Sequence, residues 1–162
     1  MNTRFEEIYD LALVVIQDYK LNNIYKSEPE VFYTFMRGLL TVGIPDFNGC
    51  LNDLSYSSEE IEFLNVGEEP VKRTVYFFNN ELTIKEKSIL SKIVVYNWFK
   101  NKVQDVTQFQ LHLSTRDFQI KSEQANLKQK SEYLDKLKED YLQEINEYQG
   151  ANLDKLPFFG DL

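Results

Sequence analysis

The sequence contains very little cysteine and histidine. Its 162 residues include one cysteine, Cys50, and one histidine, His112. A single cysteine excludes an internal disulfide and a multi-cysteine metal site, and it favours a free thiol in a reducing compartment. A lone histidine without a nearby cysteine or second histidine is a poor metal ligand, so we expect it at the surface. No local pattern supports a thiol–imidazole pair of the two.

Long apolar runs and catalytic motifs are also missing from the sequence. No segment approaches the ~20 uncharged apolar residues that a membrane-spanning helix needs. The first residues, MNTRFEEIYD, lack the basic region and cleavage site of a signal peptide. There is no Gly-rich phosphate loop, HExxH motif or EF-hand. Acidic pairs such as Glu59–Glu60 and Glu68–Glu69 are typical of solvated faces. We therefore expect a soluble protein that acts inside a cell, without catalysis, cofactor or metal.

The charge balance is acidic. The chain has 26 acidic and 18 basic residues, for a net charge of -8. Such a chain is a poor candidate for sequence-independent binding to nucleic-acid phosphates. Aromatic residues make up 14% of the chain, and both buried cores and protein interfaces use them.

The most apolar stretch is LTIKEKSILSKIVVYNWFKNKV, from Leu82 to Val103. Thr83 and Glu86 form a capping box, in which each side chain binds a backbone N–H of the first helical turn. The apolar residues that follow cover most of a helical circumference: Ile89, Leu90, Ile93, Val94, Val95, Trp98 and Phe99. A helix that is apolar on nearly all sides is buried, so we expect a central helix over residues 83–103.

Two helices are expected before it. Residues 3–20 have an amphipathic pattern, with Thr3 and Glu6 as a capping box and Asn22-Asn23 as the end signal. The second helix begins with another capping box, Ser27 and Glu30.

The second helix has further boundary signals. Pro29 falls in its first turn, where the missing N–H costs nothing. We expect its end near Val42, because Gly43 and Pro45 do not continue a helix. Residues 44–58 then contain turn-forming residues and predict a loop.

A β-hairpin is expected at about residues 60–78, with strands 60–66 and 70–78. A two-stranded ribbon is marginally stable alone, so it must lie on the helices or pair with another chain. We assign an inter-subunit contact to four of its apolar residues: Ile61, Phe63, Val75 and Phe77.

The chain after the central helix is more polar. Residues 105–108 break the apolar pattern, and residues 109–114 are ambiguous between strand and helix, with helix favoured. Residues 121–149 predict a long polar helix that ends at Gly150. Its apolar residues repeat every seven positions, at Leu127, Leu134, Tyr141 and Tyr148. Such a narrow stripe suits a seam against one neighbour, either the central helix or a second subunit.

The last segment, residues 151–162, has no periodic pattern. It contains Leu156, Pro157, Phe158 and Phe159, and two adjacent phenylalanines in a free tail would lower solubility. We therefore expect this tail to dock on the chain itself or on a partner. The predicted fold is mainly α: a helical bundle around the central helix, with one hairpin inserted at residues 59–79. A single domain spans residues 1–150, followed by the docking tail.

Two segments resemble a class of small virion proteins of tailed bacteriophages. Those proteins carry a segment of the form "nexLTxeEieiLa…mvveWl", then "DFkxfSQAnhLkel", then a long polar helix. Matches to the first segment are Leu82, Thr83, Glu86, Ile89, Leu90 and Trp98. Matches to the second are Asp117, Phe118, Ser122, Gln124, Ala125, Asn126 and Leu127, with Glu123 as an extra residue. The resemblance covers about half of the chain.

These virion proteins are similar to head–tail connectors, the adaptors of the phage neck. The resemblance implies a helical protein with a small hairpin that assembles as a ring, commonly of twelve copies, beneath the portal protein. Such a ring joins the capsid to the tail, contacts the next neck or tail protein, and lets DNA pass without specific binding. It implies no catalysis, cofactor or membrane contact, and a place in the virion neck after assembly in the host cytoplasm. The tail around Phe158 and Phe159 would then dock on the portal.

Other functions remain compatible with the sequence. The chain fits a head- or tail-completion component of a virion, or a small cytosolic helical interaction protein. An enzyme that uses inconspicuous acidic residues is the third possibility, although no cluster that would shift a pKa is visible.

Overall fold

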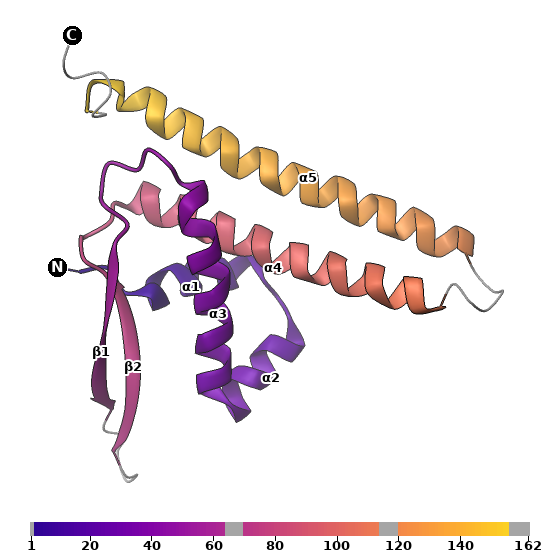
Figure 1. The fold of residues 1–162 in the computed structure, drawn as a ribbon, viewed down its shortest axis with the longest axis horizontal. Helices are drawn as coiled ribbons and strands as arrows, with labels where there is room; N and C mark the ends of the chain where they lie inside the picture. The colour runs from indigo at the N-terminus through magenta and orange to yellow at the C-terminus, as the bar shows by residue number, and fades with distance from the viewer. Residues whose placement is uncertain (1, 64–69, 114–119, 156–162) are drawn as a thin grey trace.

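The computed structural model describes residues 2–63, 70–113 and 120–155, and the side chains of these residues except 106–126. The fold is mainly α with one antiparallel β-hairpin, as the sequence predicts (Figure 1). The α-helices are α1 (Phe5–Val15), α2 (Tyr19–Ser27), α3 (Pro29–Gly43), α4 (Ile84–Leu113) and α5 (Ile120–Ala151). The strands are β1 (Tyr56–Phe63) and β2 (Val71–Phe78), and short 3-10 helices follow α3 (Ile44–Asp46) and α5 (Leu153–Lys155).

Helix α4 is the centre of the fold. The predicted capping box is confirmed: the Thr83 N–H donates to Glu86 Oε2 at 2.6 Å, and the Glu86 N–H donates to Thr83 Oγ1 at 3.3 Å. Helices α1, α3 and α5 all pack on α4. Its apolar face is completely buried, with 0% exposure at Ile89, Leu90, Ile93 and Val94. Each of these side chains contributes about 1.5–3 kcal/mol through its removal from water.

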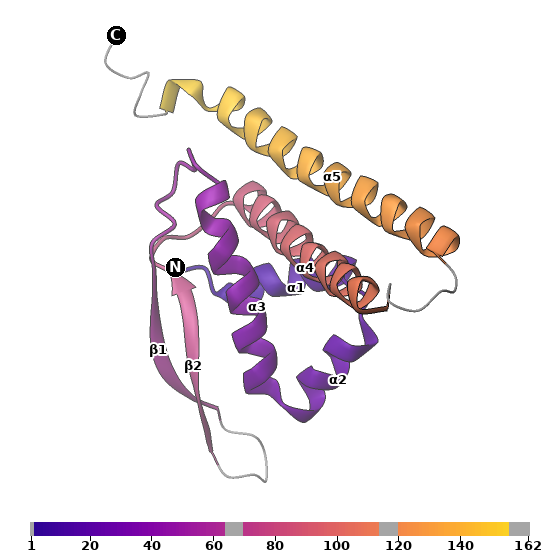
Figure 2. The same ribbon diagram turned by 45° about the vertical axis from the view of Figure 1, so that its right-hand side comes forward.

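Helix α4 is longer than predicted. It continues to Leu113, so the expected end at residue 103 and the break at residues 105–108 are wrong. Helix α5 runs antiparallel along α4 (Figures 1 and 2). Helices in proteins gain most of their stability from packing, so a segment whose own apolar pattern is weak can still be helical. With 30 and 32 residues, α4 and α5 are roughly 45–48 Å long, and their linked ends extend past the shorter helices in Figure 1.

The seven-residue stripe on α5 faces α4. The rings of Tyr96 and Tyr141 lie 5.3 Å apart, and Tyr148 lies 5.3 Å from the ring of Phe47. In the described part of α5, the buried side chains are Tyr141, Ile145 and Tyr148, all in its last third. Leu127 and Leu134 are half-buried. Helix α5 is therefore held firmly at its C-terminal end, while much of its surface stays open.

The predicted helix over residues 3–20 is two helices. The chain leaves α1 at Ile16 and enters α2 after Asp18, whose Oδ1 accepts from the backbone N–H of Lys20 at 2.8 Å. An N-cap aspartate starts a new helix here, although the apolar pattern continues past it. Asn22 and Asn23 lie inside α2 and do not end it.

The first predicted capping box has different partners. Thr3 Oγ1 accepts from the Leu82 N–H at 2.8 Å and so joins the N-terminus to the start of the central segment. The Arg4 N–H donates to Glu7 Oε1 at 2.9 Å, so Glu7 takes the place expected for Glu6.

The second predicted capping box is also wrong. Ser27 is the last residue of α2, and its hydroxyl donates to the Asn23 carbonyl at 3.0 Å. Glu28 precedes α3, whose first residue is Pro29, as the proline signal indicates.

The ribbon of β1 and β2 runs from the Tyr56–Phe78 pair to the Phe63–Val71 pair. Its first strand starts four residues before the predicted 60, and the predicted residues 64–66 lie outside the described part. At the end near the body, the Phe78 N–H donates to the Thr3 carbonyl at 2.8 Å. The other end of the ribbon extends away from the helices (Figures 1 and 2).

Gly43 allows α3 and α4 to approach closely. A Cβ at this position would overlap Ile93 Cγ2 and lie 3.0 Å from Asn97 Nδ2. We therefore expect Gly43→Ala to lower the free energy of unfolding by about 1–3 kcal/mol, measured by chemical denaturation.

Gly38 in the same helix is the matched control. A Cβ there meets no atom within 4 Å, so Gly38→Ala should raise the free energy of unfolding by up to ~1 kcal/mol. Equal effects of the two substitutions would contradict the close packing at Gly43.

Candidate interaction surfaces

Residues far apart in the sequence meet at the carboxylate of Glu86, which is 0% exposed. The Tyr148 hydroxyl donates to Oε1 at 2.6 Å, and the Asn52 amide donates to both oxygens, at 2.8 and 3.1 Å. The Thr83 N–H and hydroxyl donate to Oε2 at 2.6 and 2.9 Å. With the Cys50 thiol these residues form the Glu86 cluster. It ties the loop before β1 and the end of α5 to the start of α4.

The cluster holds a charged carboxylate by neutral donors. Burial by itself raises the pKa of Glu86, but the hydrogen bonds from Tyr148, Thr83 and Asn52 outweigh it and lower the pKa below its ordinary value. Burial and the bond to Glu86 raise the pKa of Tyr148, so its hydroxyl keeps the proton that it donates. Each of these donors is directed at Glu86, and the arrangement suits a structural role. The sequence indicated the cap but not the burial, because Asn52 and Tyr148 lie 34 and 62 positions away from Glu86.

Cys50 is not an activated nucleophile. Burial and the neighbouring Glu86 raise the pKa of its thiol to about 12, so the thiol stays protonated at neutral pH. Across the described residues, no group of three or more His, Cys, Asp and Glu side chains is placed to hold a metal ion. His112 lies on α4, and its side chain is outside the described set.

The predicted inter-subunit residues of the ribbon have different environments. Ile61, Phe63 and Phe77 are half-buried. Val75 is 1% exposed within its own chain, on a strand that packs on α1, and the alternating pattern alone does not reveal this burial. The inter-subunit contact of the four residues stays a prediction.

A cation–π contact attaches the ribbon to the helices. The Arg73 guanidinium lies 3.9 Å from the ring centre of Tyr33 on α3 and 4.6 Å from that of Phe63 on β1. Its Nη2 donates to Glu6 Oε1 on α1 at 3.1 Å. The outer edge of β1 is left open, and Glu59, Glu60 and Glu62 along it are exposed.

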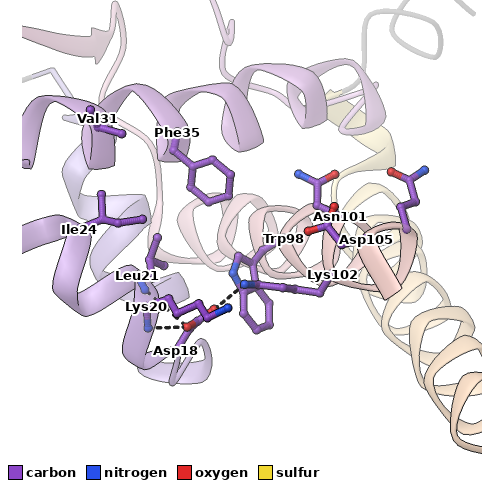
Figure 3. Close-up of a pocket in the computed structure, with 11 residues that line it drawn as sticks. Asp18, Lys20, Leu21, Ile24, Val31, Phe35, Trp98, Asn101, Lys102 and Asp105 are labelled. Carbon is purple, nitrogen blue, oxygen red and sulfur yellow. Dashed lines mark hydrogen bonds and ion pairs between the residues drawn. The ribbon is translucent and has the colours of Figure 1, made fainter. Parts of the chain in front are cut away.

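A groove opens between α2, α3 and α4 (Figure 3). It has a volume of about 440 Å³ and an apolar lining of Leu21, Ile24, Val31, Phe35 and Trp98. At its rim, Lys102 Nζ lies 2.8 Å from Asp18 Oδ2 and 5.6 Å from the Trp98 ring centre. This ion pair lowers the pKa of Asp18.

The groove continues along α3. A second hollow of about 380 Å³ shares Phe35, Asn101 and Gln104 with the first. Its α3 wall carries Val42, which is 71% exposed, and Gly38. We name the two hollows together the α3–α4 groove. Sequence analysis missed it because it depends on how α2 turns away from α1.

Docking of the C-terminal tail remains a prediction, because its residues lie outside the described part of the chain. These residues are Leu156, Pro157, Phe158 and Phe159. The described chain ends at Lys155. Shortly before this end, the side-chain amide of Asn152 donates to the Tyr148 carbonyl at 2.8 Å. Among residues 2–63, 70–113 and 120–155, no helix has the length and apolar character needed to cross a bilayer.

Replacing Glu86 tests the cluster. We expect Glu86→Gln to lower the free energy of unfolding by about 2–4 kcal/mol at pH 7, because buried donors lose a charged acceptor. The folded-state pKa of Glu86 is lowered, so its stabilisation is present above the ordinary pKa of 4.5 and is lost as pH falls through the folded-state value. The variant should therefore lose less stability than the parent between pH 5 and pH 3, measured by urea denaturation at each pH.

Glu144→Gln is the matched control. The Glu144 carboxylate pairs with Lys85 and Lys92 at a partly exposed site, so its loss should cost about 1 kcal/mol or less. A Glu86→Gln variant as stable as this control would contradict the role given to the cluster.

Comparison with known proteins gives no relative from which a role can be transferred. No protein-family model, curated protein or solved structure matches the chain.

Proposed function

We propose that this chain is a structural virion protein of a tailed bacteriophage, a head–tail connector of the neck. Copies form a ring of twelve beneath the portal protein, join the capsid to the tail and line part of the DNA channel. The proposal takes its family from the two sequence segments that resemble neck adaptors. It places the protein in the virion neck after assembly in the host cytoplasm.

The observation that carries the proposal is where the open surfaces lie. The apolar face of α4 is buried in the core of the chain. The ribbon, and the linked ends of α4 and α5, extend away from this core (Figure 1). The outer edge of β1, and the β2 edge beyond its contact with Thr3 and Arg4, offer unpaired backbone groups, and long exposed helices gain stability from neighbours. A ring subunit needs surfaces of this kind on several sides, whereas an enzyme needs a concave site with reactive groups.

The net negative charge of the chain supports a role in which DNA passes without binding. The net charge is -8, and exposed acidic residues lie along β1 and, interspersed with lysines, along α5. Like charges keep a phosphate backbone from adhering to a channel wall. In this proposal DNA moves past the ring without specific contacts.

A contact with the portal is assigned to residues 156–162. We expect a chain without these residues to fold normally, since α5 and the Glu86 cluster are complete before them. In infected cells that supply only this variant, DNA-filled heads should accumulate without tails, counted by electron microscopy.

The double substitution Phe158→Ala and Phe159→Ala separates the aromatic side chains from the length of the tail. It should reproduce the loss of joining, with a thermal unfolding midpoint equal to that of the parent. Normal numbers of joined particles with either variant would overturn the assignment. Stoichiometry in the purified particle separates a twelve-copy ring from a completion protein or a cytosolic binding protein.

A further inference from the structure

We propose that the α3–α4 groove of one copy receives the acidic β1 edge of the ribbon of a neighbouring copy. The inference deepens the proposed ring of copies and rests on that part of the proposed function alone. It assigns a specific contact to two surfaces that face solvent within one chain.

The two surfaces lie on different sides of the subunit. In both views the ribbon is on one side of α3 and α2 is on the other (Figures 1 and 2). The groove is lined by α2, α3 and α4, so the ribbon of the same chain does not reach it. A contact between unlike surfaces on two sides of a subunit joins copies head to tail, and such a contact closes into a ring when the rotation allows.

The charges of the two surfaces are complementary. Glu59, Glu60 and Glu62 are exposed on β1, while Lys20 and Lys100 are exposed at the groove. Among the described residues, none of these five charges has an ion-pair partner in its own chain. The groove also contains Lys102, Asp18 and Asp105, so its rim has three lysines and two aspartates in a chain of net charge -8. Opposite local charge selects the partner surface and its register.

The groove also carries hydrogen-bonding groups that can pair with an open strand edge. Asn101 and Gln104 present amide donors and acceptors on the α4 wall, and β1 has unpaired backbone N–H and C=O groups along its outer edge. The α3 wall carries Val31, Phe35 and Val42, which are 50%, 39% and 71% exposed. Gly38 leaves room between the larger α3 side chains.

Cross-linking of mixed chains tests the contact. The full chain, half of it labelled with ¹⁵N, is treated at millimolar concentration with a carbodiimide that joins touching carboxylates and amines. We expect peptides that link Glu59, Glu60 or Glu62 of one isotope to Lys20 or Lys100 of the other. A chain that stays monomeric, or lysine cross-links that lead instead to α5 or to residues 151–162, would overturn the proposal.

A charge exchange adds a second readout. Lys20→Glu with Lys100→Glu should weaken self-association about tenfold, measured by sedimentation velocity. Adding Glu59→Lys and Glu60→Lys to the same chain should restore it, because each ribbon then meets an acidic groove. The control, Lys136→Glu with Lys138→Glu, makes the same charge change on α5, outside both surfaces of this contact, and should leave the cross-links between ribbon and groove unchanged.

The contact would be overturned if the charge exchange failed to restore self-association, or if the control substitutions weakened the contact as much as the groove substitutions do. The test involves no portal protein. Isotope-mixed cross-links without any effect of residues 156–162 on head–tail joining would keep this contact and refute the proposed adaptor. The reverse result would refute the contact and keep the adaptor.

Discussion

The buried carboxylate of Glu86 is the interaction on which the rest of the structure depends. An anion away from water is costly unless donors surround it, so its position determines where those donors must lie. They come from Asn52 before the ribbon, from Thr83 at the start of α4 and from Tyr148 near the end of α5. Satisfying one charge therefore aligns α5 antiparallel to α4 and holds the loop before β1 against both.

This arrangement separates stability from interaction. The buried face of α4 and the Glu86 cluster stabilise the body without the ribbon edge or the outer surface of α5, whereas the α3–α4 groove shares Leu21 and Leu39 with the core. The ribbon edge and the outer surface of α5 can therefore contact other molecules without any change in the packing of the core. Buried polar groups of the described residues hold segments together, as Glu86 does for α4 and α5 and as Asn97 does through its bond to the Leu39 carbonyl.

How much the sequence predicts depends on how local each cause is. The capping box at Thr83 and the apolar run after it are local, and both were predicted correctly. The break at Asp18 was missed because an apolar stripe can continue across two helices that change direction. The extension of α4 past residue 103 and the burial of Val75 have no local pattern that marks them, so nearby residues did not predict either one. The α3–α4 groove has no sequence pattern at all, since three helices form it.

We infer that a stable body carries segments whose packing is completed by neighbouring molecules. Amide hydrogen exchange on the isolated chain and on the purified particle tests it most directly. We expect slow exchange of residues 89–95 of α4 in both samples. We expect fast exchange of β1 and of residues 127–134 of α5 in the isolated chain, and much slower exchange of these segments in the particle. Equal protection of all three segments in the isolated chain, or no change on assembly, would show that neighbours do not complete them.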